Sequence, residues 1–107
     1  MEVKIYQNSN GDEPFITWLE SLRDETTRLR IRKRLRRIEQ NNLGDAVSAG
    51  EGIYELRMHF GPGYRVYFGY SGPEEILLLV GGDKSSQVHD IQKAKHFWQD
   101  YKRSMEL

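Results

Sequence analysis

The sequence contains no cysteine, only three prolines and no long apolar run. Without cysteine, the chain can form neither a disulfide nor a thiolate metal site, and a reducing, intracellular setting fits best. The longest apolar run, residues 76–80, is far too short to span a bilayer, and the first residues lack the charged-then-apolar pattern of a signal peptide. We therefore expect a cytoplasmic protein that does not enter a membrane.

The chain also lacks net charge, because sixteen basic residues balance sixteen acidic ones. This balance hides a local excess of positive charge between residues 28 and 37, where seven cations occur without an acid: Arg28, Arg30, Arg32, Lys33, Arg34, Arg36 and Arg37. Charged partners respond to local fields, within a Debye length of about 8 Å at physiological salt. A neutral total therefore does not exclude a polyanionic partner.

The first half of the chain predicts one strand and two helices. Residues 2–7 form a plausible strand, and Asp12 is the expected N-cap of a helix whose apolar residues share one face: Phe15, Trp18, Leu19 and Leu22. A second helix is expected from Asp24 to about Gln40, with a narrow apolar stripe and arginines on its other sides. Residues 43–51 are expected to form a polar loop.

The second half predicts three antiparallel strands and a last helix. The strands cover about residues 53–60, 64–70 and 76–80, separated by turns that contain glycine and proline. The helix begins near Ser85 or Ser86 and is expected to bury Val88, Ile91, Ala94, Trp98, Tyr101 and Met105. The chain of 107 residues thus predicts one domain, residues 1–107, with an α+β fold whose helices pack on one face of an antiparallel sheet.

Polar residues are expected to gather on the other face of this sheet. Alternation along the first two strands assigns four side chains to that face: Arg57, His59, Arg65 and Tyr67. Lys84 follows the third strand, and Gln87 and His89 lie in the first turns of the last helix, near its partly positive end. Several cations on one surface indicate a phosphate ligand.

Such a set suits RNA cleavage without a metal. A base must take the proton of the 2′-hydroxyl, cations must stabilise the phosphorane, and an acid must protonate the leaving 5′-oxygen. Arginine matches two phosphate oxygens, and histidine titrates near neutrality. The sequence lacks His-x-x-x-His, a cluster of acids and a phosphate-binding loop, so we expect no metal, no cofactor and no nucleotide hydrolysis.

Each of these residues also has a simpler interpretation. Arg57 can pair with Glu55 or with an acid on an adjacent strand, and the same holds for Arg65. His59 and His89 can be solvated histidines. The arginine-rich helix can be a solvated or partner-binding surface. The functional interpretation depends on the convergence of several cations and not on any one of them.

Four motifs in the second half resemble the RelE/ParE toxin superfamily, and within it the HigB-like addiction-module killer proteins. These are ELR at 55–57, GPGYRVYF at 61–68, LLLVGGDKSSQ at 77–87 and HDI at 89–91. The resemblance covers nearly the whole chain, since the order of elements also agrees with the RelE-like β-α-α-β-β-β-α fold. It implies the toxin of a type II toxin–antitoxin pair, an mRNA endonuclease that acts in the ribosomal A site without a metal.

The resemblance also assigns roles to individual positions. Arg57, Arg65, Lys84 and His89 would be catalytic, and ribosomal or messenger RNA would bind at His59, Tyr67, Gln87, Arg30, Arg34 and Arg37. The sequence departs from RelE where Val88 and His89 replace a tyrosine and Glu55 replaces a lysine. The partner implied is an antitoxin, a small helix-turn-helix protein, in a hetero-oligomer.

The same fold leaves two other functions open. A ParE-like protein poisons DNA gyrase by binding, and its active surface would be the helical hairpin at residues 12–40. A decayed toxin would keep only the binding of its antitoxin.

Overall fold

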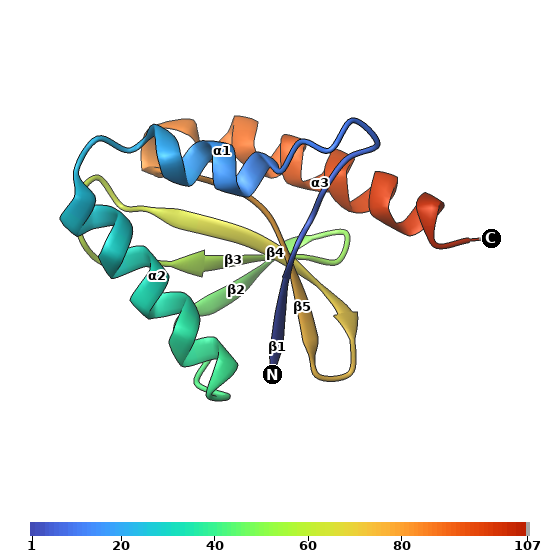
Figure 1. The fold of residues 1–107 in the computed structure, drawn as a ribbon, viewed down its shortest axis with the longest axis horizontal. Helices are drawn as coiled ribbons and strands as arrows, with labels where there is room; N and C mark the ends of the chain where they lie inside the picture. Colours follow the sequence, from blue (N-terminus) through green and yellow to red (C-terminus); the bar gives the residue numbers. More distant parts are fainter. Residues whose placement is uncertain (107) are drawn as a thin grey trace.

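Residues 1–106, which a computed structural model describes, form a five-stranded mixed sheet with three α-helices and one short 3-10 helix. The first elements are β1 (Glu2–Ile5), α1 (Pro14–Ser21), α2 (Glu25–Glu39), β2 (Ala46–Gly50) and β3 (Ile53–Arg57). They are followed by β4 (Arg65–Gly72), β5 (Glu75–Gly82), η1 (Lys84–Ser86) and α3 (Gln87–Ser104). The strand order is β1-β5-β4-β3-β2, with β1 parallel to β5 and the other neighbours antiparallel (Figure 1). The predicted α+β class is confirmed.

The prediction of a polar loop at residues 43–51 is wrong in part, because β2 lies within it. β2 pairs antiparallel with β3, from Ala46 opposite Leu56 to Gly50 opposite Ile53. The connecting residues Glu51 and Gly52 both have positive φ, 54° and 84°, as the central residues of a type I′ hairpin turn do. The sequence did not predict β2 because its small, weakly apolar side chains show little alternation between apolar and polar residues.

The helices cover both faces of the sheet, so the prediction that they share one face is also wrong. Helices α1 and α2 place five residues against one face of β3, β4 and β5: Phe15, Leu19, Ile31, Leu35 and Ile38. Helix α3 packs Ala94 and Trp98 against the other face, where Ile53, Tyr67 and Leu79 lie. The face that alternation marked as polar is therefore a second core over most of its area, and only its end near Arg57 is polar.

Fewer residues of helix α3 pack on the sheet than the sequence predicted. Ala94 and Trp98 are buried, and Ile91 and Tyr101 pack partly, but Val88 and Met105 are 75% and 67% exposed. Trp98 lies so close to β4 that a Cβ on Gly69 would come within 2.7 Å of its indole. Val88 stands in the first turn of α3 and Met105 directly follows its last turn, so both lie at the ends of the helix.

The two N-terminal helices begin differently. Asp24 caps α2, since its carboxylate accepts from the backbone N–H of Thr26 at 3.2 Å and from the hydroxyl of Thr27 at 2.9 Å. Asp12 does not cap α1; the N-cap is Glu13, whose side chain makes no capping bond. None of the helices in residues 1–106 is long and apolar enough to cross a membrane.

Candidate nucleic-acid interface

A groove of about 500 Å³ runs between α2 and the end of β3. Six of its eight lining residues are basic or histidine, and the other two are Met58 and Phe60; the six are Arg30, Lys33, Arg34, Arg37, Arg57 and His59. None of the eight lining residues is acidic. We call this hollow the basic groove.

The helical wall of the basic groove follows from the period of α2. Positions 30, 33, 34 and 37 recur at i, i+3, i+4 and i+7, which is one helical face. The apolar residues at 31, 35 and 38 occupy the neighbouring face and pack on the sheet. Packing of that apolar face therefore fixes where the cations stand.

Arg34 differs from the other cations of the wall because it is only 8% exposed. Its Nη2 donates to the carbonyl of Leu43 at 2.5 Å, and a Cβ on Gly44 would clash with the guanidinium. Burial, assisted by the positive charge of Arg37, lowers the pKa of Arg34. Arg34 therefore lines the basic groove with little of its side chain exposed, and its main contact ties α2 to the loop before β2.

A second hollow of about 360 Å³ continues from the basic groove around the β3–β4 turn, and the two share residues 57–60. It is lined further by Gly61, Gly63, Tyr64 and Arg65. Gly61 and Gly63 both have positive φ, 57° and 78°, which glycine adopts without strain. The turn thereby brings Arg65 of β4 to the same surface as Arg57 of β3.

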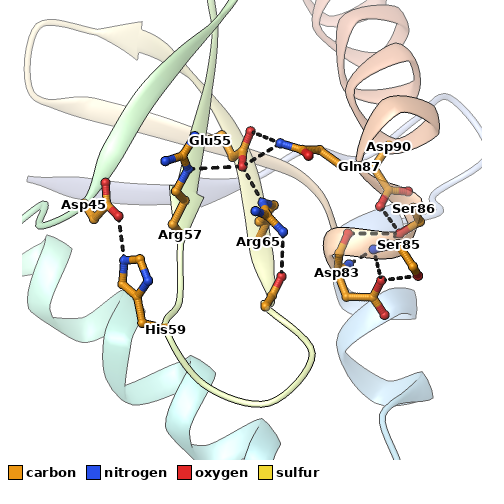
Figure 2. A network of polar contacts seen from close by, with 11 residues as sticks. Asp45, Glu55, Arg57, His59, Arg65, Asp83, Ser85, Ser86, Gln87 and Asp90 are labelled. Atoms are coloured by element: carbon orange, nitrogen blue, oxygen red, sulfur yellow. Dashed lines mark hydrogen bonds and ion pairs between the residues drawn. The ribbon is translucent and has the colours of Figure 1, made fainter.

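Glu55 places its carboxylate between the side chains of Arg57 and Arg65 (Figure 2). Its side chain is 3% exposed, and its Oε1 accepts from Arg65 Nε at 2.5 Å and lies 3.5 Å from Arg57 Nε. Gln87, at the start of α3, donates its amide N–H to both carboxylate oxygens at 3.1 Å. Gln87 thus reaches the cluster through Glu55, whereas the sequence predicted a direct contact with RNA.

Lys84 is the first residue of η1 and is exposed. Its backbone N–H donates to the carbonyl of Pro62 at 3.3 Å, and its Cβ approaches the β3–β4 turn at Gly63. Asp83 caps η1 by accepting from Ser85, and these hydrogen bonds lower the pKa of Asp83. Lys84 is therefore close to the turn that carries Arg65, as its place in the sequence predicted.

The two histidines predicted to act here lie in different places. His59 lines both hollows, is 74% exposed, and places Nε2 2.6 Å from the carboxylate of Asp45. This leaves Nδ1 away from the pair, as Figure 2 shows. His89 is exposed on α3 and lines neither hollow. The structure therefore brings His59, and not His89, to the arginines.

Tyr67 does not lie on the surface. It is fully buried under α3, opposite Glu55 in the sheet, and its hydroxyl finds no hydrogen-bond partner within residues 1–106. Burial, assisted by the negative charge of Glu55, raises the pKa of Tyr67. The prediction that Tyr67 contacts RNA is therefore wrong for this conformation, because the sheet face at this point belongs to the second core.

Sequence reasoning missed three features of the interface. Lys33 lines the basic groove, and its spacing from Arg30 and Arg37 was a sufficient signal. Phe60 is half-buried: it packs against the core and also forms a groove wall, on which the Arg30 guanidinium stacks at 3.8 Å from the ring centroid. Glu55 was seen only as a partner of single arginines. In residues 1–106, no three His, Asp or Glu side chains lie close enough together to share a metal ion.

Comparison with known proteins identifies one clear relative. An uncharacterised protein of Haemophilus influenzae is 42% identical over 81 residues, which are 76% of this chain and 82% of that protein. The chain belongs to the family of this protein. No protein-family model matches the chain. The relationship establishes common ancestry, and any activity has to be argued from the groove itself.

Proposed function

We propose that this protein is a toxin of the RelE/ParE type, of the HigB-like branch, that cleaves ribosome-held mRNA without a metal. The observation that carries the proposal is the basic groove. Its exposed cations and its stacked Arg30–Phe60 pair suit single-stranded RNA. The phosphates of the RNA can bind to the cations, and its bases can stack on aromatic or guanidinium planes. Two of the motifs that resemble the RelE/ParE superfamily contribute to these hollows: ELR at 55–57 supplies Arg57, and GPGYRVYF at 61–68 supplies the residues of the adjoining turn.

The chemistry assigns the arginines to charge stabilisation. Arg57 and Arg65 lie on opposed positions of β3 and β4, so a phosphate above them meets two guanidinium groups. As the 2′-oxygen attacks, the equatorial phosphate oxygens gain negative charge, and donors placed in advance stabilise that charge. Lys84 adds a further positive charge beside the turn.

Proton transfer is assigned to His59. Its Nε2 is held by Asp45, which orients the ring and leaves Nδ1 available for the 2′-hydroxyl proton or for the leaving 5′-oxygen. His89 does not line the groove, so His59→Ala should lower cleavage far more than His89→Ala. Equal losses from both variants would contradict this assignment.

The test of the proposal is ribosome-containing translation in vitro with mapping of mRNA ends. Wild-type protein should arrest translation and produce new 3′ ends, and Arg57→Ala/Arg65→Ala should abolish both while circular dichroism shows an intact fold. Persistent cleavage by the folded double variant would refute the catalytic assignment. Expression of the protein in cells distinguishes the two alternatives. A DNA-damage response with intact protein synthesis would indicate a ParE-like gyrase poison. Absence of any growth defect would indicate an inactive binding module.

The proposal includes the partners that the resemblance implies. A toxin of this kind acts on the ribosome and its mRNA, and a helix-turn-helix antitoxin would hold it inactive in a hetero-oligomer. The neighbouring reading frame should encode that antitoxin, and co-expression of the two should restore growth.

A further inference from the structure

Arg57 and Arg65 face each other directly across β3 and β4. Like charges at directly opposed positions destabilise a sheet, so an anion near both is needed to hold them together. Glu55 supplies it, two residues before Arg57 on the same face of β3 and diagonal to Arg65. One buried carboxylate therefore serves two arginines.

The contacts of this carboxylate use only one edge of each guanidinium. Arg65 offers Nε to Glu55 and Nη1 to the carbonyl of Gly63 at 2.9 Å. Arg57 turns its buried Nε towards Glu55 at 3.5 Å, which is an ion pair without a hydrogen bond, and its side chain as a whole is 41% exposed. The terminal amino groups of Arg57 and the Nη2 of Arg65 remain to donate to phosphate oxygens.

Glu55 itself cannot act on the substrate. Its side chain is 3% exposed, and both oxygens already accept from the Gln87 amide in addition to the arginine contacts. Any effect of Glu55 on a reaction must therefore pass through the two arginines.

We propose that Glu55 is a positioning residue that holds Arg57 and Arg65 at their Nε edges and presents the terminal amino groups of Arg57 and the Nη2 of Arg65 to the scissile phosphate. The inference rests on the proposed function, in which these arginines stabilise the phosphorane. Gln87 completes the clamp by fixing the carboxylate from the start of α3. The arrangement accounts for an acid at a position where an added cation would only raise the repulsion between the arginines.

The principal variant is Glu55→Gln, which keeps the shape of the side chain but removes its charge. Cleavage under single-turnover conditions should fall about 10–100-fold, because misplacing a catalytic group by 1 Å can cost about 10²-fold. Affinity for a 2′-O-methyl RNA oligonucleotide, which cannot be cleaved, should not fall, since the groove keeps its cations and loses one nearby anion. Glu74→Gln, which removes one exposed acid in the β4–β5 turn, is the matched control and should leave both quantities unchanged.

Gln87→Ala provides a second variant if Glu55→Gln does not fold. Gln87 is only partly buried, and its loss removes two hydrogen bonds from Glu55. Cleavage should fall several-fold with unchanged affinity for the 2′-O-methyl RNA. Arg65→Lys should reduce the cleavage rate less when it is added to either variant than when it is made in the wild type, because both changes remove the same clamp.

The Nε–H signals of Arg57 and Arg65 in NMR spectra test the clamp without reference to catalysis. They should be protected from solvent exchange in the wild type and lose that protection in Glu55→Gln. Unchanged protection, wild-type cleavage by the folded variant, or equal losses of cleavage and RNA affinity would each overturn the inference. Wild-type protein that shows protected Nε–H groups but no cleavage would instead refute the proposed function and leave the clamp standing.

Discussion

The dependence of RNA binding on salt is the most direct quantitative test of the basic groove. Arg30, Lys33 and Arg37 are exposed groove cations, whereas Arg34 is buried. Arg57 and Arg65 share the negative charge of Glu55, so together they contribute about one net positive charge. The groove therefore offers about four charges to a polyanion.

These charges predict a specific slope. Binding to a single strand releases counterions in proportion to the phosphates neutralised, so log K should fall against log salt with a slope of about −0.7 × 4, or about −2.8. Raising the salt from about 50 to about 200 mM should then weaken binding about 50-fold. The assay is fluorescence anisotropy of a labelled, non-cleavable 2′-O-methyl RNA across that range of salt.

A matched pair of double variants locates the charges on one side of α2. Lys33→Gln/Arg37→Gln removes two groove cations and should reduce the slope by about 1.4. Arg32→Gln/Arg36→Gln makes the same change of charge on the same helix, but these two side chains line a separate hollow against β1, so the slope should change little. Equal effects from the two variants, or a slope near zero for the wild type, would refute the claim that RNA lies in the basic groove.

Three further predictions concern stability, each measured by urea unfolding. Tyr67→Phe should leave the free energy of unfolding unchanged or raise it by up to about 2 kcal/mol, because the buried hydroxyl finds no partner within residues 1–106; a loss above about 1 kcal/mol would show that it has one. Gly81→Ala should cost about 1–3 kcal/mol, since the new Cβ would come within 2.2 Å of the Trp18 ring, and a neutral result would show that the indole moves freely. Asp24→Ala should cost about 1 kcal/mol through loss of the α2 cap, whereas Glu13→Ala, which removes no capping bond, should change stability by less than about 0.5 kcal/mol; equal costs would contradict the capping geometry.

The helices were predictable because their signals are local. The spacing of Ile31, Leu35 and Ile38 indicates a helix whatever the rest of the chain does, and Asp24 marks its start. Asp12 carried the same kind of signal but does not cap α1. Whether a residue caps a helix depends on its own backbone angles. The helix start can therefore move by one residue, here from Asp12 to Glu13, without any change in the sequence pattern that predicts the helix.

The layering of the sheet was not predictable in the same way. Alternation separates the two faces of a strand, but it does not reveal whether a polar or mixed face is covered by another element. Ile53 and Tyr67 lie on the face that also carries Arg57, and α3 covers the first two while leaving the arginine half-exposed. The direction in which α3 crosses the sheet decides which residues of that face are covered. This direction depends on the whole fold and not on the sequence of one strand.

The sequence predicted which residues gather at the site better than it predicted which side chains contact one another there. Arg57, Arg65 and His59 were predicted to share a surface, and they do, because the β3–β4 turn has the expected glycines. The role of Glu55 depends on register, which places Arg57 opposite Arg65 and leaves Glu55 diagonal to the second arginine. Register is set by turn geometry and core packing together, so the sequence pattern alone could not assign this carboxylate to both.

The cations of α2 bear on function because they oppose the stability of the helix. Arg30, Arg34 and Arg37 stand three and four residues apart, and like charges at these spacings destabilise a helix by a few tenths of a kcal/mol per pair. Burial of Ile31, Leu35 and Ile38 offsets that loss, since fully burying one such side chain contributes about 1.5–3 kcal/mol. The fold therefore keeps a self-repelling row of cations beside the paired arginines of the sheet, and a bound phosphate backbone would relieve the repulsion in both elements at once.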